Sequence, residues 1–269
     1  MLYKHILVEQ DQYKVLTITL NRPEVRNALN TATLLELLAV FQNEAQKPEA
    51  HCIVLTGTGV AFCAGQDLEE RRAFAYPPAG NEPAEKPSIM DSLRQRYNPL
   101  IKAMRDSARP IIGAVNGVAA GAGCSLALAC DMRLMAESAV LMESFVRVGL
   151  GMDGGSSYFL PHLVGTAKAF ELALTGDKVE AIEAERLGLV NRVVPDARLM
   201  EETYALARRL AAGAPQALGR VKRALNFAQD ATLEQALDNE AVLQQEAANG
   251  QEYPEGLRAF FEKRPPKFS

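Results

Sequence analysis

Two glycine-containing turns are the segments of the chain best suited to chemistry. The first runs through residues 62–68 (FCAGQDL) and the second through residues 116–124 (NGVAAGAGC). Small residues let a backbone approach a ligand closely, and the first N–H groups of a helix lack partners within it. If two such turns faced each other, they could direct two N–H groups at a single oxygen. That arrangement would be an oxyanion hole.

These turns have two other interpretations when they are taken alone. Glycines that follow strands are commonly turns and nothing more. A phosphate-binding loop is the second alternative, but neither turn has the GxxxxGKS/T pattern, and Gly121 and Gly123 lack a third glycine at the spacing of a dinucleotide fingerprint. The residues by themselves therefore leave both the oxyanion hole and a plain turn open.

One carboxylate lies in a run of small residues. Asp153 is part of the segment GLGMDGG at residues 149–155, which could present its side chain to a ligand. The alternative is structural, because an Asp just before a helix is very often its N-cap, and a helix is expected to begin near Ser156. The residues alone do not decide between these two roles.

The elements that must position these residues alternate between strands and helices. Val15–Leu20 is β-branched and alternating, and residues 52–56 form a short apolar run, so both predict strands, as do residues 110–115. A helix capped by Asn30 or Thr31 is expected after the first strand, because apolar residues recur at helical spacing at Leu34, Leu37, Leu38 and Phe41. This order favours an α/β architecture with covered sheets.

The later part of the chain has three further expected features. Residues 70–93 contain prolines and charges and predict a long loop or flap. A helix is expected to resume at Ser88 and to run to about Met104. From about Val179 the pattern is helical to the end. We place a boundary near residues 195–200, between an α/β core at residues 1–197 and a C-terminal helical region for oligomerisation at residues 198–269.

Composition and charge limit the functional classes. The chain has 269 residues, 48% of them apolar, and a formal net charge of -4. This charge supplies no overall field to hold nucleic acid. Neither a targeting peptide nor a run long enough to cross a bilayer is seen, so a cytoplasmic protein without a membrane partner is expected. Buried reduced thiols and no metal site are expected, because metal-ligand spacing is lacking at Cys52, Cys63, Cys124 and Cys130.

Three motifs resemble those of the enoyl-CoA hydratase/isomerase (crotonase) superfamily. Residues 62–68 are similar to its first signature, residues 114–131 (AVNGVAAGAGCSLALACD) to its second, and residues 21–29 to its N-terminal motif. The resemblance covers nearly the whole chain, with the motifs in the family's order. It implies a spiral of repeated ββα units followed by a helical trimerisation region. It also implies an acyl-CoA thioester as substrate and no further cofactor, because coenzyme A is part of the substrate.

The resemblance implies roles for individual residues. The backbone N–H groups of Gln66 and Ala122 would bind the thioester oxygen. Other residues match positions along the bound substrate, and these are Arg26, Ala28, Ala64, Asp67, Leu68, Tyr97 and Phe145. Family members are usually trimers or dimers of trimers. The C-terminal tail is either a solvated helix end with a docking aromatic face or a source of cations, such as Lys263, for the phosphates of CoA, in the same or a neighbouring subunit.

Two positions depart from the hydratase pattern of the family. Hydratases hold a water between two glutamates, whose positions match Ser125 and Phe145 here, and neither residue can act as a carboxylate base. Glu143 lies two positions from Phe145, and a role as a substitute stays open. Isomerase branches carry a single acid that matches Asp153, so the resemblance favours an acid–base role over a cap.

The expected function is therefore that of an acyl-CoA isomerase. The resemblance points to the ring-1,2-epoxyphenylacetyl-CoA isomerases of phenylacetate degradation, which form an oxepin, and double-bond migration in an enoyl-CoA is the related reaction. An apolar pocket around Phe145 and Leu150 would raise the pKa of Asp153 and suit it to proton transfer. The alternatives are an enoyl-CoA hydratase or another acyl-CoA enzyme of the fold, and a non-catalytic member that binds acyl-CoA or RNA.

Overall fold

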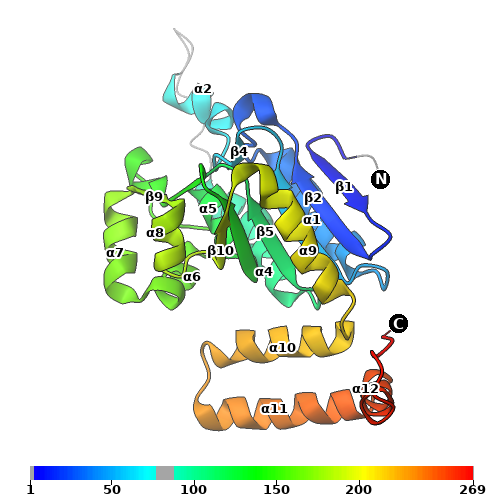
Figure 1. Ribbon diagram of the computed structural model, residues 1–269. Helices are drawn as coiled ribbons and strands as arrows, with labels where there is room; N and C mark the ends of the chain where they lie inside the picture. Colours follow the sequence, from blue (N-terminus) through cyan, green and yellow to red (C-terminus); the bar gives the residue numbers. More distant parts are fainter. Residues whose placement is uncertain (1–2, 77–87, 269) are drawn as a thin grey trace.

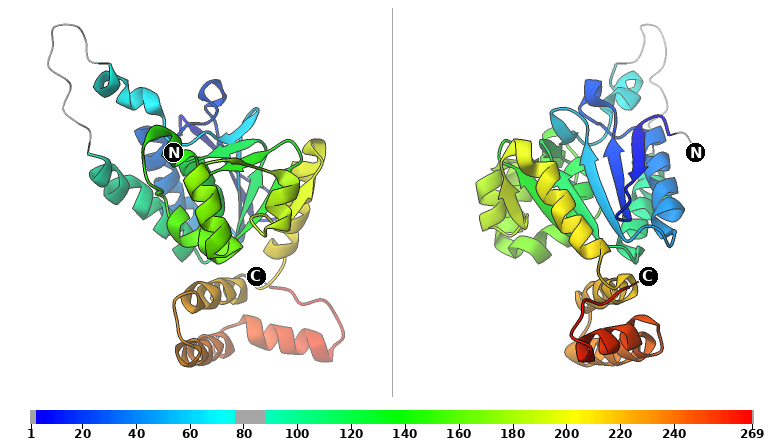
Figure 2. Two further views of the ribbon diagram at one scale, coloured as in Figure 1. Left: turned by 90° about the vertical axis from the view of Figure 1, so that its left-hand side faces the viewer. Right: turned by 45° about the vertical axis from the view of Figure 1, so that its right-hand side comes forward.

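The computed structural model describes residues 3–76 and 88–268 (Figure 1). Two sheets and the helices around them form a core. The last three helices lie to one side of this core. Helix α10 (Pro215–Ala228) contacts it through the ion pair of Lys222 with Asp131, and α11 (Leu233–Ala248) and α12 (Glu252–Phe261) follow (Figure 2). None of the helices in the described residues is long and apolar enough to cross a membrane.

The larger sheet has six strands in the order β1-β2-β3-β5-β7-β10. Only the β1–β2 pair is antiparallel. The inner strands are almost completely buried, as expected for a parallel sheet covered on both faces. The strands are β1 (Ile6–Gln10), β2 (Val15–Leu20), β3 (Cys52–Gly57), β5 (Ile111–Val115), β7 (Met132–Ala136) and β10 (Arg192–Val194).

A smaller sheet has the order β4-β6-β8-β9. Its strands have three residues each: β4 (Ala61–Cys63), β6 (Val118–Ala120), β8 (Val140–Met142) and β9 (Lys178–Glu180). The chain enters it after each of β3, β5 and β7, and then continues into a helical segment. This succession of a long strand, a short strand and a helix confirms the predicted spiral of ββα units.

The predicted helices of the first half are confirmed with their caps. The side chain of Asn30 accepts a hydrogen bond from the Thr33 amide at the start of α1 (Thr31–Gln42). Ser88 caps a run of three consecutive segments, α3 (Ile89–Ser92), η4 (Leu93–Tyr97, π-helical) and α4 (Asn98–Asp106). Smaller helical segments in this half are η1 (Pro23–Val25), η2 (Glu44–Gln46), η3 (Leu68–Arg71) and α2 (Arg72–Ala75).

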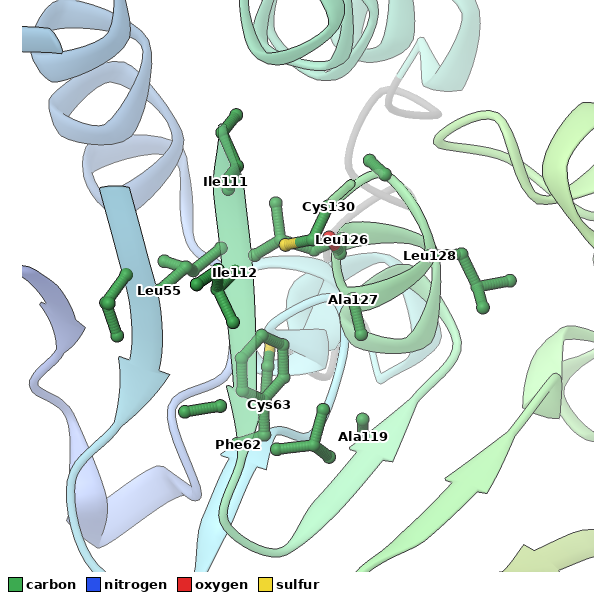
Figure 3. Packing of buried hydrophobic residues seen from close by; sticks show 14 of the residues in the cluster. Leu55, Phe62, Cys63, Ile111, Ile112, Ala119, Leu126, Ala127, Leu128 and Cys130 are labelled. Atoms are coloured by element: carbon green, nitrogen blue, oxygen red, sulfur yellow. Dashed lines mark hydrogen bonds between the residues drawn. The ribbon is translucent and has the colours of Figure 1, made fainter. Parts of the chain in front are cut away.

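The helices that follow the second turn complete the core. The first of them, α5 (Ala122–Leu128), is buried at every residue. Later ones are η5 (Ser144–Val148), α6 (Ser156–Val164), α7 (Thr166–Thr175), α8 (Ala181–Arg186), η6 (Asp196–Arg198) and α9 (Leu199–Ala211). Figure 3 shows how α5 packs against β3–β6 through residues such as Phe62, Ala119 and Leu126. All four cysteines are buried and free.

Three expectations about the chain need correction. The segment from Val179 is not helical throughout, because it contributes β9 and β10, whose three residues are too few to show a strand period. The predicted boundary at 197/198 cuts α9 from the sheet, although α9 packs on β2, β3, β5 and β7 (Figure 2). The flanks of the predicted 70–93 loop are helical in η3, α2 and α3. Its central residues 77–87 lie outside the described residues.

Candidate active site

The two glycine turns touch each other directly. Gly65 has φ 96° and Gly121 has φ 50°, conformations that residues with a side chain rarely adopt. A Cβ atom at Gly65 would lie 2.6 Å from the carbonyl oxygen of Ala120. A Cβ at Gly123 would collide with the carbonyl group of Cys63. The contact between the turns therefore depends on glycine at these positions.

Two backbone N–H groups without protein acceptors lie where the turns meet. Gln66 follows Gly65 and Ala122 follows Gly121. A Cβ atom at Gly65 would be 3.5 Å from the Ala122 nitrogen, so the two stretches of backbone are adjacent. In the part of the chain that the structure describes, neither the Gln66 amide nor the Ala122 amide donates a hydrogen bond. Both residues border the same cavity, so both amides are available to a ligand there.

The N-terminal motif holds the first turn in place. The Leu29 amide donates to the Gly65 carbonyl at 2.7 Å, and the Leu29 carbonyl accepts from the Asp67 amide at 3.0 Å. This parallel bridge engages the neighbours of Gln66 on both sides and leaves its N–H free. The Ala64 amide also donates to the carbonyl of Arg26 at 2.9 Å.

The cavity has a volume of about 140 Å³ and a mixed lining. It brings together six of the predicted site residues: Ala64, Gln66, Leu68, Ala122, Phe145 and Asp153. It also includes Arg147, which the sequence reasoning missed although it lies two residues from Phe145. The Arg147 guanidinium is 3.5 Å from Asp177 and supplies a cation at this border. The other lining residues are Gly65, Gly121, Ser144, Val148 and Leu150.

Asp153 is a half-buried residue and not a helix cap. Helix α6 has Gly155 at its N-cap and no side-chain cap bond. Oδ1 of Asp153 is buried without a hydrogen-bond partner. Burial raises the pKa of Asp153 to about 6. The capping alternative is therefore wrong, and the predicted direction of the pKa shift is confirmed.

The two positions that match hydratase glutamates carry no acid. Ser125 is buried on α5 and donates to the backbone of the Asp153 loop, and Phe145 forms part of the cavity wall. Glu143 lies outside the lining. It is buried, and its Oε1 lies 3.0 Å from the Ser156 hydroxyl oxygen, within hydrogen-bonding distance. Burial foremost raises the pKa of Glu143 to about 7.

Several predicted substrate contacts are not among the residues that line the cavity. Arg26 and Ala28 contribute backbone carbonyl groups, and the latter accepts from Arg22 at 2.6 Å. Asp67 forms a half-buried ion pair of 2.8 Å with Arg22 and accepts from an amide of η3. In this chain these three residues support the first turn, and none is among those that border the cavity.

Tyr97 and Lys263 also lie outside the lining. Tyr97 is buried in η4 with its hydroxyl group unpaired. Burial, with a smaller effect of Asp153, raises the pKa of Tyr97 well above its usual range. Lys263 follows α12 among the helices that lie to one side of the core (Figure 1).

Comparisons with known proteins agree over almost the whole chain. Residues 10–269 match the family model described as enoyl-CoA hydratase/isomerase. A Rhodobacter capsulatus protein named "Probable enoyl-CoA hydratase" is 43% identical over 252 residues, which are 94% of this chain and 93% of that protein. The 1,2-epoxyphenylacetyl-CoA isomerase of Escherichia coli is 39% identical over 255 residues, 95% of each protein.

The fold agrees with a solved structure in the same way. The enoyl-CoA hydratase from Polaromonas sp. JS666 superposes with a TM-score of 0.88 at 34% identity, covering 98% of this chain and 99% of that chain. The family's two signature turns and the spiral that carries them are thus both present. The protein belongs to the enoyl-CoA hydratase/isomerase family of acyl-CoA enzymes.

Proposed function

We propose that this protein is an acyl-CoA isomerase that combines an oxyanion hole with a single acid–base residue. One observation carries the proposal. Among the described residues, the N–H groups of Gln66 and Ala122 have no protein acceptor, and they border the same small cavity as Asp153, whose Oδ1 is buried without a hydrogen-bond partner. Ser125 and Phe145 add no second carboxylate to it, so the site is better suited to moving a proton than to holding a water.

In the proposed mechanism the thioester oxygen accepts hydrogen bonds from both amides. The bonds polarise the carbonyl group and make the protons on the neighbouring carbon more acidic. They also stabilise the enolate that forms when one of these protons leaves. Such a donor typically contributes about 2.7–4 kcal/mol to the stabilisation of the transition state.

Asp153 transfers the proton. Because burial places its pKa at about 6, the carboxyl group can both take and return a proton near neutral pH. With a 3-enoyl-CoA it takes a proton from the carbon beside the thioester and returns one two carbons further along, which moves the double bond. With ring-1,2-epoxyphenylacetyl-CoA the same groups would support opening of the epoxide and rearrangement to the oxepin. These steps need no cofactor beyond the CoA of the substrate.

The 39% identical Escherichia coli isomerase supports the epoxide reaction and a place in phenylacetate catabolism. A hydratase is the second candidate, because the 43% identical Rhodobacter relative is named as one. Hydration needs a base on the water and an acid for carbon, and the lining offers one carboxyl group. We rank isomerisation first for this reason.

Assembly forms a second part of the proposal. We expect a cytoplasmic homotrimer or dimer of trimers, in which the C-terminal helices meet other copies. Lys263, which lies far along the chain from the cavity residues, would then contact the CoA phosphates of a neighbouring subunit. Arg258 and Arg264 are less available, because both pair with Glu255.

A comparison of three thioesters tests the proposed function. The purified protein is mixed with crotonyl-CoA, a 3-enoyl-CoA and ring-1,2-epoxyphenylacetyl-CoA, and the products are identified by chromatography and mass spectrometry. Turnover of the epoxide or of the 3-enoyl-CoA, to a product of unchanged mass, is the expected result. Fast hydration of crotonyl-CoA without isomerisation would favour the hydratase instead.

A further inference from the structure

A chain of buried hydroxyl groups connects Glu143 to the loop that carries Asp153. Oε1 of Glu143 lies 3.0 Å from Oγ of Ser156, and this Oγ lies 2.8 Å from Oγ of Ser125. Oγ of Ser125 is in turn 2.9 Å from the backbone carbonyl oxygen of Asp153. Both serines are 0% exposed and Glu143 is 3% exposed, so the chain must be completed by its own hydrogens.

The number of hydrogens fixes the direction of this chain. A serine hydroxyl has one hydrogen, and a carbonyl oxygen can only accept. If Ser125 donates to the Asp153 carbonyl, the contact between Ser125 and Ser156 needs the hydrogen of Ser156. None then remains for the contact between Ser156 and Glu143, so Glu143 itself must donate. The complete chain therefore requires Glu143 as a neutral carboxylic acid.

Ionisation of Glu143 reverses the chain. A carboxylate only accepts, so Ser156 turns its hydrogen toward Glu143 and Ser125 turns its own toward Ser156. The Asp153 carbonyl then keeps only the Ser156 amide, at 3.1 Å. The nearby Gly121 carbonyl, 3.3 Å from Ser125, does not change the count because it also only accepts.

The lost bond is a link between two parts of the candidate site. It joins the Asp153 loop to α5, the helix that begins with Ala122. Gly154 and Gly155 follow Asp153 with positive φ values, 58° and 86°, and provide no side chain that could hold the loop. The Ser125 hydroxyl therefore helps to set the distance between the acid and one of the two amides.

The surroundings of Glu143 favour its neutral form. Within residues 3–76 and 88–268, no Lys or Arg side chain pairs with it, and its Oε2 is buried without a hydrogen-bond partner. The titratable groups that face it are the Cys124 thiol of α5 and the Asp153 carboxyl group. Burial, with a smaller effect of Asp153, outweighs the hydrogen-bond donors and raises the pKa of Glu143 to about 7.

We propose that Glu143 is a positioning residue whose proton orders Ser156 and Ser125 and thereby holds the Asp153 loop against α5. Its effect on catalysis rests on the function proposed above. Glu143 does not border the cavity, so it acts through the serines and touches no substrate. When it ionises, the loop loses its tether and the acid is displaced from the thioester.

Two substitutions at this position separate the proton from the shape of the side chain. In Glu143→Gln the amide N–H can donate to Ser156 at every pH, and the side chain keeps nearly the same volume. In Glu143→Leu neither a donor nor an acceptor remains, so Ser156 can still donate to Ser125 and Ser125 to the Asp153 carbonyl. The rates of the wild type, both variants and Ser125→Ala are compared from about pH 5 to about pH 9, with the thioester that the protein turns over.

The expected profiles differ in their alkaline limbs. The wild-type rate should fall above a pH of about 7, where Glu143 ionises. Glu143→Gln and Glu143→Leu should both lack this fall, because neither side chain can ionise and draw the Ser156 hydrogen away from Ser125. Ser125→Ala, which removes the bond to the Asp153 carbonyl, should be slow throughout, by up to about 10²-fold, as expected for a misplaced catalytic group. An unchanged alkaline limb in Glu143→Gln would overturn the proposal, as would a Ser125→Ala variant as fast as the wild type at low pH.

A readout without substrate separates this proposal from the proposed function. Hydrogen exchange of the 153–156 amides, corrected for intrinsic rates, should speed up in the wild type as pH rises through about 7 and stay slow in Glu143→Gln. Ser125→Ala, which cuts the last link, should exchange fast at every pH. If Asp153→Asn is fully active while this exchange pattern is observed, the proposed function is wrong, but the proposed hydrogen bond between Ser125 and the Asp153 loop is supported. If exchange is the same in the wild type and all variants, the proposed role of Glu143 in holding the loop is wrong.

Discussion

Around the two turns the side chains are small and enclosed, whereas helices α10–α12 hold large apolar side chains in solvent. The turn residues Cys63 and Ala119 are completely buried. The helices expose side chains that their own chain does not cover, among them Val221, Leu225, Leu233, Leu237, Val242, Phe260 and Phe261. Extended exposed apolar surface marks contacts with other molecules. Residues from both turns thus line the cavity, while the exposed apolar side chains of the C-terminal helices are consistent with the assembly proposed above.

The largest expected effect concerns the acid of the enclosed region. Asp153→Asn keeps the shape of the side chain and removes the proton carrier, so kcat/KM should fall by about 10²–10⁴-fold. Steady-state rates with the turned-over thioester measure the change, and circular dichroism checks folding. Asp238→Asn, an exposed Asp of α11, is the matched control and should leave the rate unchanged. Wild-type activity of Asp153→Asn would remove Asp153 from the mechanism.

Separating the turns should cost nearly as much. In Gly123→Ala the new Cβ would collide with the Cys63 carbonyl and push the two turns apart, which removes an amide from the thioester oxygen. Loss of one such donor lowers kcat by about 10²–10³-fold. Gly151→Ala is the control, because no atom lies within 4 Å of its Cβ position. Equal rates for both variants would show that the contact between the turns does not set the geometry.

A smaller effect is expected where the helices carry exposed aromatic rings. Phe260→Ser combined with Phe261→Ser should weaken self-association, because burying a Phe side chain contributes about 1.5–3 kcal/mol. Sedimentation at several protein concentrations would measure the shift. Val60→Ser, between β3 and β4, is the control, because Val60 is 79% exposed and thus about as exposed as the two Phe side chains. Unchanged association would exclude these two rings from the subunit contacts.

The smallest effect concerns the tail cation. Lys263→Ala should weaken CoA binding by no more than about fivefold, since an exposed ion pair contributes about 0.2–1 kcal/mol. The difference from the wild type should shrink as salt is added. Lys102→Ala, an exposed Lys of α4, is the control in the same calorimetric titration. An affinity equal to that of the wild type at low salt would contradict the proposed role of Lys263.

Local sequence patterns predicted much of the fold and part of the site. The strand Val15–Leu20, the cap at Asn30 or Thr31 and the start of a helix at Ser88 depend on neighbours a few residues away. All three are confirmed, with Asn30 as the cap. The short strands of the second sheet were missed, because three residues do not show a period. The roles assigned to Gln66, Ala122 and Asp153 stay predictions, although the structure brings the three to one cavity.

The sequence by itself determined the family, the order of the elements and the glycines that let two turns touch. Only the tertiary structure decided which residues are neighbours in space. In the folded protein Asp153 does not cap α6, Arg147 borders the cavity, and two serines connect Glu143 to the Asp153 loop. The physical reason is distance along the chain. Burial and hydrogen-bond partners come from segments that meet only in the folded protein, and these set the pKa and orientation of each group.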